Sequence, residues 1–128
     1  MSDFNSENNR AVWFDIPVTD LERAAKFYEA VLDVGVHVDT YEDCSFGVLE
    51  HKDGNGGCLI PQEGEIASEG GILIYMNVNG RIHDAIEKVT ANGGTVVEPI
   101  HAIGPHGFRA IILDSEGGRM ALHSTVDA

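Results

Sequence analysis

The sequence predicts an α+β domain built from two tandem βαβββ modules with mixed sheets and the helices outside. One order of signals occurs twice: an alternating strand, an amphipathic helix, and a glycine-rich turn before a late strand. The first strands end at Val18 and Val78, 60 residues apart, and the turns begin at Asp53 and Asp114, 61 residues apart. Because this offset of about 60 residues is maintained over four elements, we interpret the chain as one module used twice.

The first strand and helix are predicted by their periodicity. In residues 12 to 18, every second side chain is apolar and would share one face of a strand: Val12, Phe14, Ile16 and Val18. A helix is expected from about residue 20 to 33, because Thr19 and Asp20 can cap it and Thr19-x-x-Glu22 fits a capping box. Apolar residues then recur at helical spacing, and Gly35 is expected to end the helix.

The same reasoning assigns the other elements. Three short extended runs complete the first module, at residues 36 to 41, 44 to 50 and 58 to 62. The second module is expected to have its helix near residues 80 to 92. Its strands are expected near residues 72 to 78, 95 to 100, 107 to 113 and 119 to 123.

These elements form one predicted domain. Module one spans about residues 11 to 62, a Glu- and Gly-rich linker about 63 to 70, and module two about 71 to 124. Residues 1 to 10 are mostly polar and lack periodicity, so we expect a disordered or frayed tail. A sheet of about 60 residues covered by one helix has a bare face, which pairing with its copy would bury.

Net charge, cysteine spacing and hydropathy indicate which partners and which compartment to expect for the protein. The formal net charge of −13 repels phosphate backbones and anionic membranes, so no nucleic acid or membrane partner is expected. The two cysteines, Cys44 and Cys58, lack a CxxC spacing and are interpreted as free thiols of a reducing compartment, although a disulfide remains open. No apolar run reaches a membrane span and the N-terminus is unlike a signal peptide, which favours a soluble cytoplasmic protein.

Three phrases of the repeated plan carry a family resemblance: IPVTDLERAAKFYEAVL, ANGG before a Val-rich strand, and ILDSEGGRMAL. Residues 11 to 124 resemble the vicinal oxygen chelate superfamily, which includes glyoxalase I, extradiol dioxygenases and the fosfomycin and bleomycin resistance proteins. The resemblance implies a cleft between the curved sheets. In the metal-dependent members, the first and last strands of each module provide the ligands of a divalent ion.

The resemblance also tells which residues would occupy those ligand positions here: Trp13, Ile60, Leu73 and Ala121. None of these side chains has a carboxylate, imidazole, amide or thiolate donor. The usual metal site is therefore expected to be absent. Lactoylglutathione lyase activity, which depends in this family on the ion as a Lewis acid, is not expected either.

Strand alternation then predicts the rest of the cleft. If the four side chains face inward, so do those two residues along each strand: Asp15, Cys58, Gln62, Tyr75, Asn77, Arg119 and His123. An apolar cavity with a few polar groups suits a small organic ligand, with Trp13 and Tyr75 as packing surfaces and Arg119 or His123 at an anionic or polar end. In the structural alternative, Arg119 pairs with an acid and the aromatic rings are ordinary core.

Several functional hypotheses remain open. The favoured one is a metal-independent binding protein of the bleomycin-resistance type, with no cofactor and no assigned catalytic residue. The alternative is a lyase- or dioxygenase-like metalloenzyme whose divalent metal is displaced to Asp15, Gln62, Tyr75 and His123, with Asn77 as a further donor. A third is a module that acts through its surface. Exposed strand edges predict a homodimer, and the family resemblance implies the same, since its members commonly form dimers.

Overall fold

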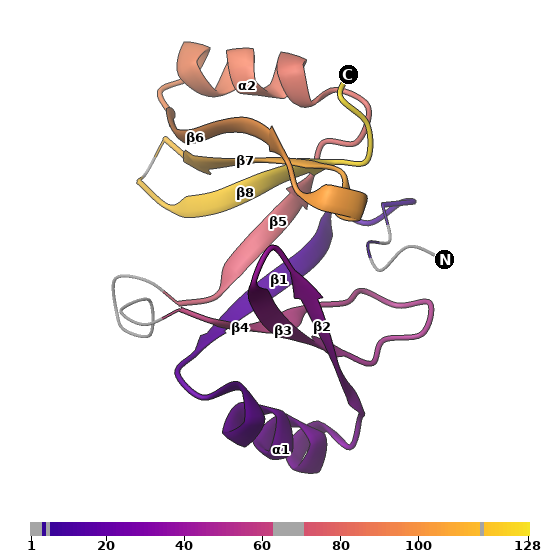
Figure 1. The fold of residues 1–128 in the computed structure, drawn as a ribbon. Helices are drawn as coiled ribbons and strands as arrows, with labels where there is room; N and C mark the ends of the chain where they lie inside the picture. Colours follow the sequence, from indigo (N-terminus) through magenta and orange to yellow (C-terminus); the bar gives the residue numbers. More distant parts are fainter. Residues whose placement is uncertain (1–3, 5, 63–70, 116) are drawn as a thin grey trace. The chain divides into compact units, whose positions relative to one another are not determined.

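The computed structural model describes Phe4 and residues 6–62, 71–115 and 117–128, and it confirms the α+β class and both βαβββ modules (Figure 1). The first module consists of β1 (Ala11–Val18), α1 (Leu21–Leu32), β2 (Val36–Tyr41), β3 (Cys44–Leu49) and β4 (Cys58–Pro61). The second consists of β5 (Leu73–Asn77), α2 (Ile82–Ala91), β6 (Thr95–Ala102), β7 (Phe108–Leu113) and β8 (Arg119–Ser124), with a short 3-10 turn at Gly104–His106. The predicted linker, residues 63 to 70, lies outside the described residues.

The described chain divides into two compact units. The β1–β4 unit comprises Phe14–Ile72, and the β5–β8 unit comprises Leu73–Ala128 together with Trp13 and the described residues before it. Strand β1 therefore contributes residues to both units. Half-buried Cys44 and buried Cys58 are not joined in a disulfide. Neither of the two α-helices in the described ranges has the length and apolar character needed to cross a membrane.

In the β1–β4 unit, the strand order is β2-β3-β4-β1, with β1 and β4 parallel and the other pairs antiparallel. Helix α1 covers one face, where Val18, Leu49 and Leu59 form a buried core. Phe14 packs on the same core, and a Cβ atom at Gly57 would collide with its ring. Glycine at this position thus lets the turn before β4 approach the core closely.

The start of α1 differs from the predicted capping box. The N-cap is Asp20, whose Oδ1 accepts a hydrogen bond from the backbone N–H of Arg23 at 3.0 Å. Thr19 Oγ1 instead accepts a side-chain bond from the Arg23 guanidinium at 3.0 Å. The helix ends at Leu32, before the expected Gly35, and its C-cap Asp33 adopts the left-handed conformation.

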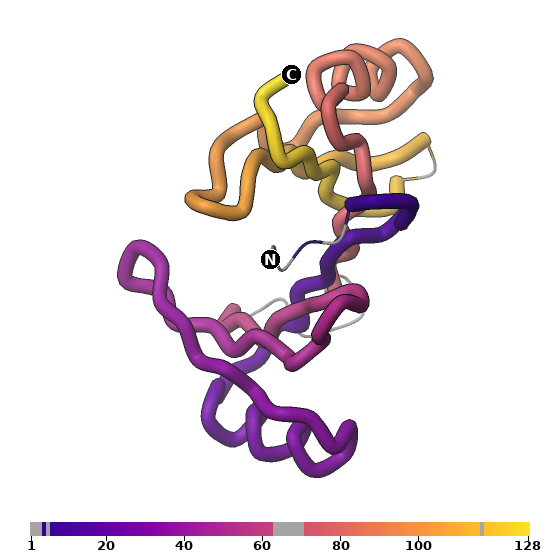
Figure 2. Tube along the Cα trace, turned by 90° about the vertical axis from the view of Figure 1, so that its right-hand side faces the viewer, coloured from indigo at the N-terminus to yellow at the C-terminus, as the bar shows by residue number. Residues whose placement is uncertain are grey.

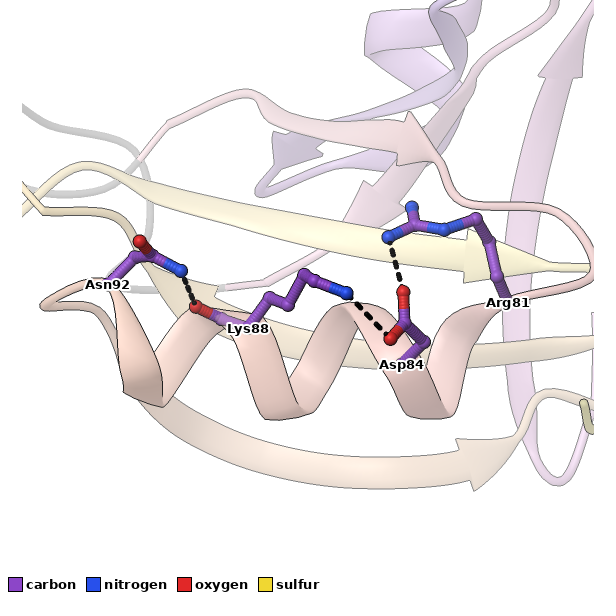
Figure 3. Close-up of polar contacts among 4 residues, drawn as sticks. All are labelled: Arg81, Asp84, Lys88 and Asn92. Atoms are coloured by element: carbon purple, nitrogen blue, oxygen red, sulfur yellow. Dashed lines mark hydrogen bonds and ion pairs between the residues drawn. The ribbon is translucent and has the colours of Figure 1, made fainter.

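In the β5–β8 unit, the strand order is β5-β8-β7-β6, with β5 and β8 parallel and the other pairs antiparallel. Helix α2 covers one face, where Ala85, Ile112 and Leu122 form the buried core. The exposed side of α2 carries an ion-pair ladder (Figure 3), in which Asp84 accepts from Arg81 at 2.9 Å and from Lys88 at 2.8 Å. The hydrogen bonds from Lys88 and then Arg81 lower the pKa of Asp84, and Asn92 Nδ2 closes the helix by donating to the Lys88 carbonyl.

The described part of the N-terminal segment makes contacts within the β5–β8 unit, and the frayed tail expected for residues 1 to 10 stays a prediction. Asn77 Nδ2 donates to the carbonyl oxygens of Ser6 and Asn9, each at 2.7 Å, and its backbone N–H donates to the Arg10 carbonyl. Figure 2 shows this segment alongside the end of β5. Phe4 is buried, with 5% of its surface exposed. The side-chain amide of Asn77 and the buried ring of Phe4 thus hold this segment, although its sequence has no periodic pattern.

Candidate functional site

The polar residues of interest lie on the faces that the helices leave uncovered. In the β5–β8 unit, strand pairing aligns Asn77 with His123, His123 with Arg109, and Arg109 with His101. Directly paired residues project from the same face of a sheet. Their sequence neighbours Met76 and Leu122 pack toward α2, so this row lies on the opposite face.

Arg109 is the centre of this row. Its Nη1–H donates to the Tyr75 hydroxyl at 2.6 Å, and its Nε–H donates to His101 Nε2 at 3.3 Å. The guanidinium carbon also lies 5.9 Å from the centroid of the Tyr75 ring, within the range of a cation–π contact. His101 Nδ1 lies 2.8 Å from the Pro99 carbonyl, so it carries the proton and Nε2 accepts.

The electrostatic state of Arg109 is unusual for an acidic protein. Both hydrogen-bond partners are neutral groups, and no carboxylate in the described part of the chain pairs with this guanidinium. The chain carries 21 acidic residues against 8 basic ones. A half-buried guanidinium supported only by neutral groups favours an added anion, because arginine binds carboxylate and phosphate oxygens with two parallel hydrogen bonds.

An aromatic stack lies beside Arg109. The Phe4 ring is stacked between Trp13, at 4.5 Å between centroids and 20° between planes, and His123, at 4.2 Å and 9°. The rings of Tyr75 and His106 tilt toward Phe4, at 5.8 Å and 5.9 Å. Tyr75 thus contacts both the stack and Arg109.

His123 is fully buried and neutral. Its Nε2–H donates to the His106 carbonyl at 2.6 Å, while Nδ1 is buried without a hydrogen-bond partner in the described ranges. Burial lowers the pKa of His123, an effect that the bond to the His106 carbonyl partly opposes and the charge of the His106 imidazole reinforces. An imidazolium here would bury a second N–H without an acceptor.

The β1–β4 unit contributes a smaller polar pair. Asp15 and Cys58 are paired in register between β1 and β4, and the Cys58 thiol donates to Asp15 Oδ1 at 3.3 Å. Both side chains are buried. The predicted alternation of β1 is confirmed, because Phe14 and Ile16 pack on the core beneath α1 while Asp15 between them contacts Cys58.

The four positions that the family uses for metal ligands do not fit a metal in this chain. Trp13, Leu73 and Ala121 are buried and Ile60 is half-buried, and none has a donor atom for a divalent cation. Within the described ranges, no three His, Cys, Asp or Glu side chains form a group that could hold an ion. These four side chains therefore supply no ligand atom for a divalent cation.

The structure brings some of the predicted residues together and leaves others apart. Trp13, Tyr75 and His123 are brought together around Phe4, and Asp15 meets Cys58. Asn77 anchors the N-terminal segment, while Arg119 and Gln62 are exposed at strand ends. A joint cleft that includes residues of both units stays a prediction.

Sequence reasoning missed Arg109, His101 and Phe4. A signal for Arg109 was present, because a hairpin about the turn at residues 114 to 118 pairs Leu113 with Arg119 and therefore Arg109 with His123. No periodic signal marks Phe4, the only aromatic residue in a mostly polar segment.

Comparison with known proteins agrees with this architecture. A sequence profile of the Glyoxalase/Bleomycin resistance protein/Dioxygenase superfamily matches residues 10–122. A glyoxylase-like domain-containing protein of Didymella fabae is 30% identical over 97 residues, which cover 72% of this chain and 74% of that protein.

Solved structures show the same fold at low sequence identity. A hypothetical protein of Bacillus halodurans has a TM-score of 0.71 and 16% identity, covering 92% of this chain and 95% of that one. Methylmalonyl-CoA epimerase of Mycobacterium tuberculosis has a TM-score of 0.67 and 17% identity, covering 90% and 87%. A chain described as NAD-dependent benzaldehyde dehydrogenase of Legionella pneumophila has a TM-score of 0.62 and 16% identity, covering 88% and 96%. By its sequence profile and its fold, this chain belongs to the Glyoxalase/Bleomycin resistance protein/Dioxygenase superfamily.

Proposed function

We propose that this protein binds a small organic anion on the face of the β5–β8 sheet opposite α2, with Arg109 as the anion-binding group. The observation that carries the proposal is the guanidinium whose described hydrogen-bond partners, Tyr75 and His101, are both neutral. Their contacts fix the plane of the guanidinium, so part of the entropic cost of binding is met before a ligand arrives. Arg109 thereby takes the place that Arg119 or His123 had been expected to fill.

The proposed binding mode is metal-independent. The side chains at the family's ligand positions have no donor atoms. In the displaced set, three side chains already make other hydrogen bonds: the Tyr75 hydroxyl accepts from Arg109, Asn77 Nδ2 donates to two carbonyls, and His123 Nε2 donates to the His106 carbonyl. No observation on the described residues favours the displaced metalloenzyme, which metal analysis of the purified protein would test directly.

We also propose that the protein works as a homodimer. Helix α1 exposes large apolar side chains, Phe27 (57%), Val31 (61%) and Leu32 (50%), on a surface that its own unit leaves uncovered. Apolar side chains gathered on one element favour association with a second copy. The negative charge of each chain opposes that association, so the contact has to be apolar.

Isothermal titration with two probes of equal shape tests the anion proposal. Benzoate and benzamide share a ring but differ in charge, so we expect wild-type protein to prefer benzoate. Arg109→Gln should weaken benzoate binding about tenfold or more while leaving benzamide unchanged, since a hydrogen bond to a charged group is worth about 1.5–3 kcal/mol. Arg109→Lys should weaken binding less, because it keeps the charge but not the planar fork.

Arg119→Gln is the matched control, because Arg119 is an exposed arginine of the neighbouring strand. It should leave the preference for benzoate intact. If Arg119→Gln removed the preference and Arg109→Gln did not, the original expectation for Arg119 would replace this proposal. Equal binding of both probes by the wild type would remove the anion-binding role altogether.

A further inference from the structure

The described residues enclose a flat aromatic slot that the chain fills with its own side chain. Phe4 lies nearly parallel to the rings on both sides, at 20° to Trp13 and 9° to His123. Two parallel walls at stacking distance accept a planar ring far better than an aliphatic group or a rounded cation. Tyr75 and His106 close the surroundings of the same ring.

We infer that this slot is a binding site for the planar aromatic ring of a ligand, and that Phe4 is an internal competitor which occupies the site when no ligand is bound. The inference rests on the proposed function for the anionic group of the ligand, because Tyr75 contacts both Phe4 and Arg109. An aromatic carboxylate would place its ring in the slot and its carboxylate at the guanidinium.

Three features make Phe4 a replaceable occupant. It is the only aromatic residue in the mostly polar segment of residues 1 to 10. Its side chain carries no polar atom. The backbone after it is held separately, by the bonds of Asn77 to the carbonyls of Ser6 and Asn9, so the ring can leave while that anchor stays.

Trp13 supplies a direct readout, because it is the only tryptophan of the chain and forms one wall of the slot. Phe4→Ala should change the emission of Trp13 and tighten benzoate binding about tenfold or more, since removing an internal competitor raises the fraction of binding-competent protein. Cyclohexanecarboxylate, which has the same charge but a puckered ring, should gain much less.

The second variant, Phe4→Leu, retains apolar volume without a flat ring and tests the inference if Phe4→Ala does not fold. It too should bind benzoate more tightly than wild-type protein. The inference is overturned if the folded variants bind benzoate no more tightly than the wild type, or if benzoate and cyclohexanecarboxylate gain equally.

The double variant Phe4→Ala/Arg109→Gln separates this inference from the proposed function. If it keeps the change in Trp13 emission on adding benzoate but loses the preference for benzoate over benzamide, both ideas stand. If the preference for benzoate over benzamide persists without Arg109, the proposal that Arg109 binds the anion is wrong, whereas the inference about the aromatic slot still holds. If Arg109→Gln weakens benzoate while neither Phe4 variant strengthens it, the anion proposal is retained and the slot fails.

Discussion

His123 gives the clearest prediction for a single residue, because burial lowers its pKa below the usual value of 6.5. The folded state therefore binds fewer protons than the unfolded state between the two pKa values. Stability is complete above pH 6.5 and is lost as the pH falls from 6.5 through the lowered pKa. The midpoint of urea unfolding should thus decrease between about pH 7 and 5.

His123→Phe should flatten this pH dependence, since phenylalanine does not titrate but can stack on Phe4. His37→Gln, on exposed β2, is the control and should keep the wild-type slope. The His106 ring also faces Phe4, so the double variant with His106→Gln shows whether any residual slope comes from that ring. An unchanged slope in His123→Phe would contradict the assignment.

Strand alternation grouped three residues that do lie together around Phe4. It brought Trp13, Tyr75 and His123 to one place because period two fixes which side chains share a face. Arg109 was missed because it lies on β7, whereas the ligand positions of the family lie on the first and last strands of each module. Phe4 could not be predicted, since a long-range aromatic contact made by an unperiodic segment leaves no local pattern.

Among the elements, α1 offers a test of which residue caps a helix. The Asp20 carboxylate accepts from the backbone N–H of Arg23, whereas Thr19 accepts only from the Arg23 side chain. Asp20→Ala should therefore reduce the free energy of unfolding by about 1 kcal/mol, as loss of an N-cap does. Thr19→Ala should cost less than about 0.5 kcal/mol, as exposed substitutions usually do.

Chemical denaturation of both variants beside the wild type measures the difference. A larger loss for Thr19→Ala than for Asp20→Ala would restore the capping box that the sequence suggested. Sequence alone could not choose between the two, because adjacent Thr and Asp are both good caps and the choice depends on where the chain leaves β1.

The other elements were predicted closely because each carries a strong local signal. Strand β2 spans Val36–Tyr41 as expected, and α2 spans Ile82–Ala91 within the predicted range. Strand β6 runs two residues further than expected, to Ala102, with shifts of register against β7. Such irregular pairing depends on the partner strand and cannot be deduced from one segment's periodicity.

For the whole molecule, the internal repeat was the most informative signal. Repetition of four elements at an offset of about 60 residues predicted two βαβββ modules before any contact was known. It did not predict that Trp13 and the described residues before it would belong to the unit of the second module. That assignment depends on the contacts of Phe4 and Asn77, which the repeat does not contain.

A homodimer is the state that we expect for this protein in solution, because α1 exposes large apolar side chains. Sedimentation at micromolar concentration should show a species of twice the 13.8 kDa chain mass. Because each chain carries a net charge of −13, added salt should strengthen the dimer by screening repulsion, the reverse of its effect on a contact made of ion pairs.

Val31→Glu on α1 should shift the protein toward monomer, because it places a further negative charge in an apolar contact. Val97→Glu on β6, where the valine is similarly exposed at 52%, is the matched control and should leave the dimer intact. A monomer at all salt concentrations would rule out the dimer, and dissociation by Val97→Glu alone would move the contact from α1 to the β6 edge.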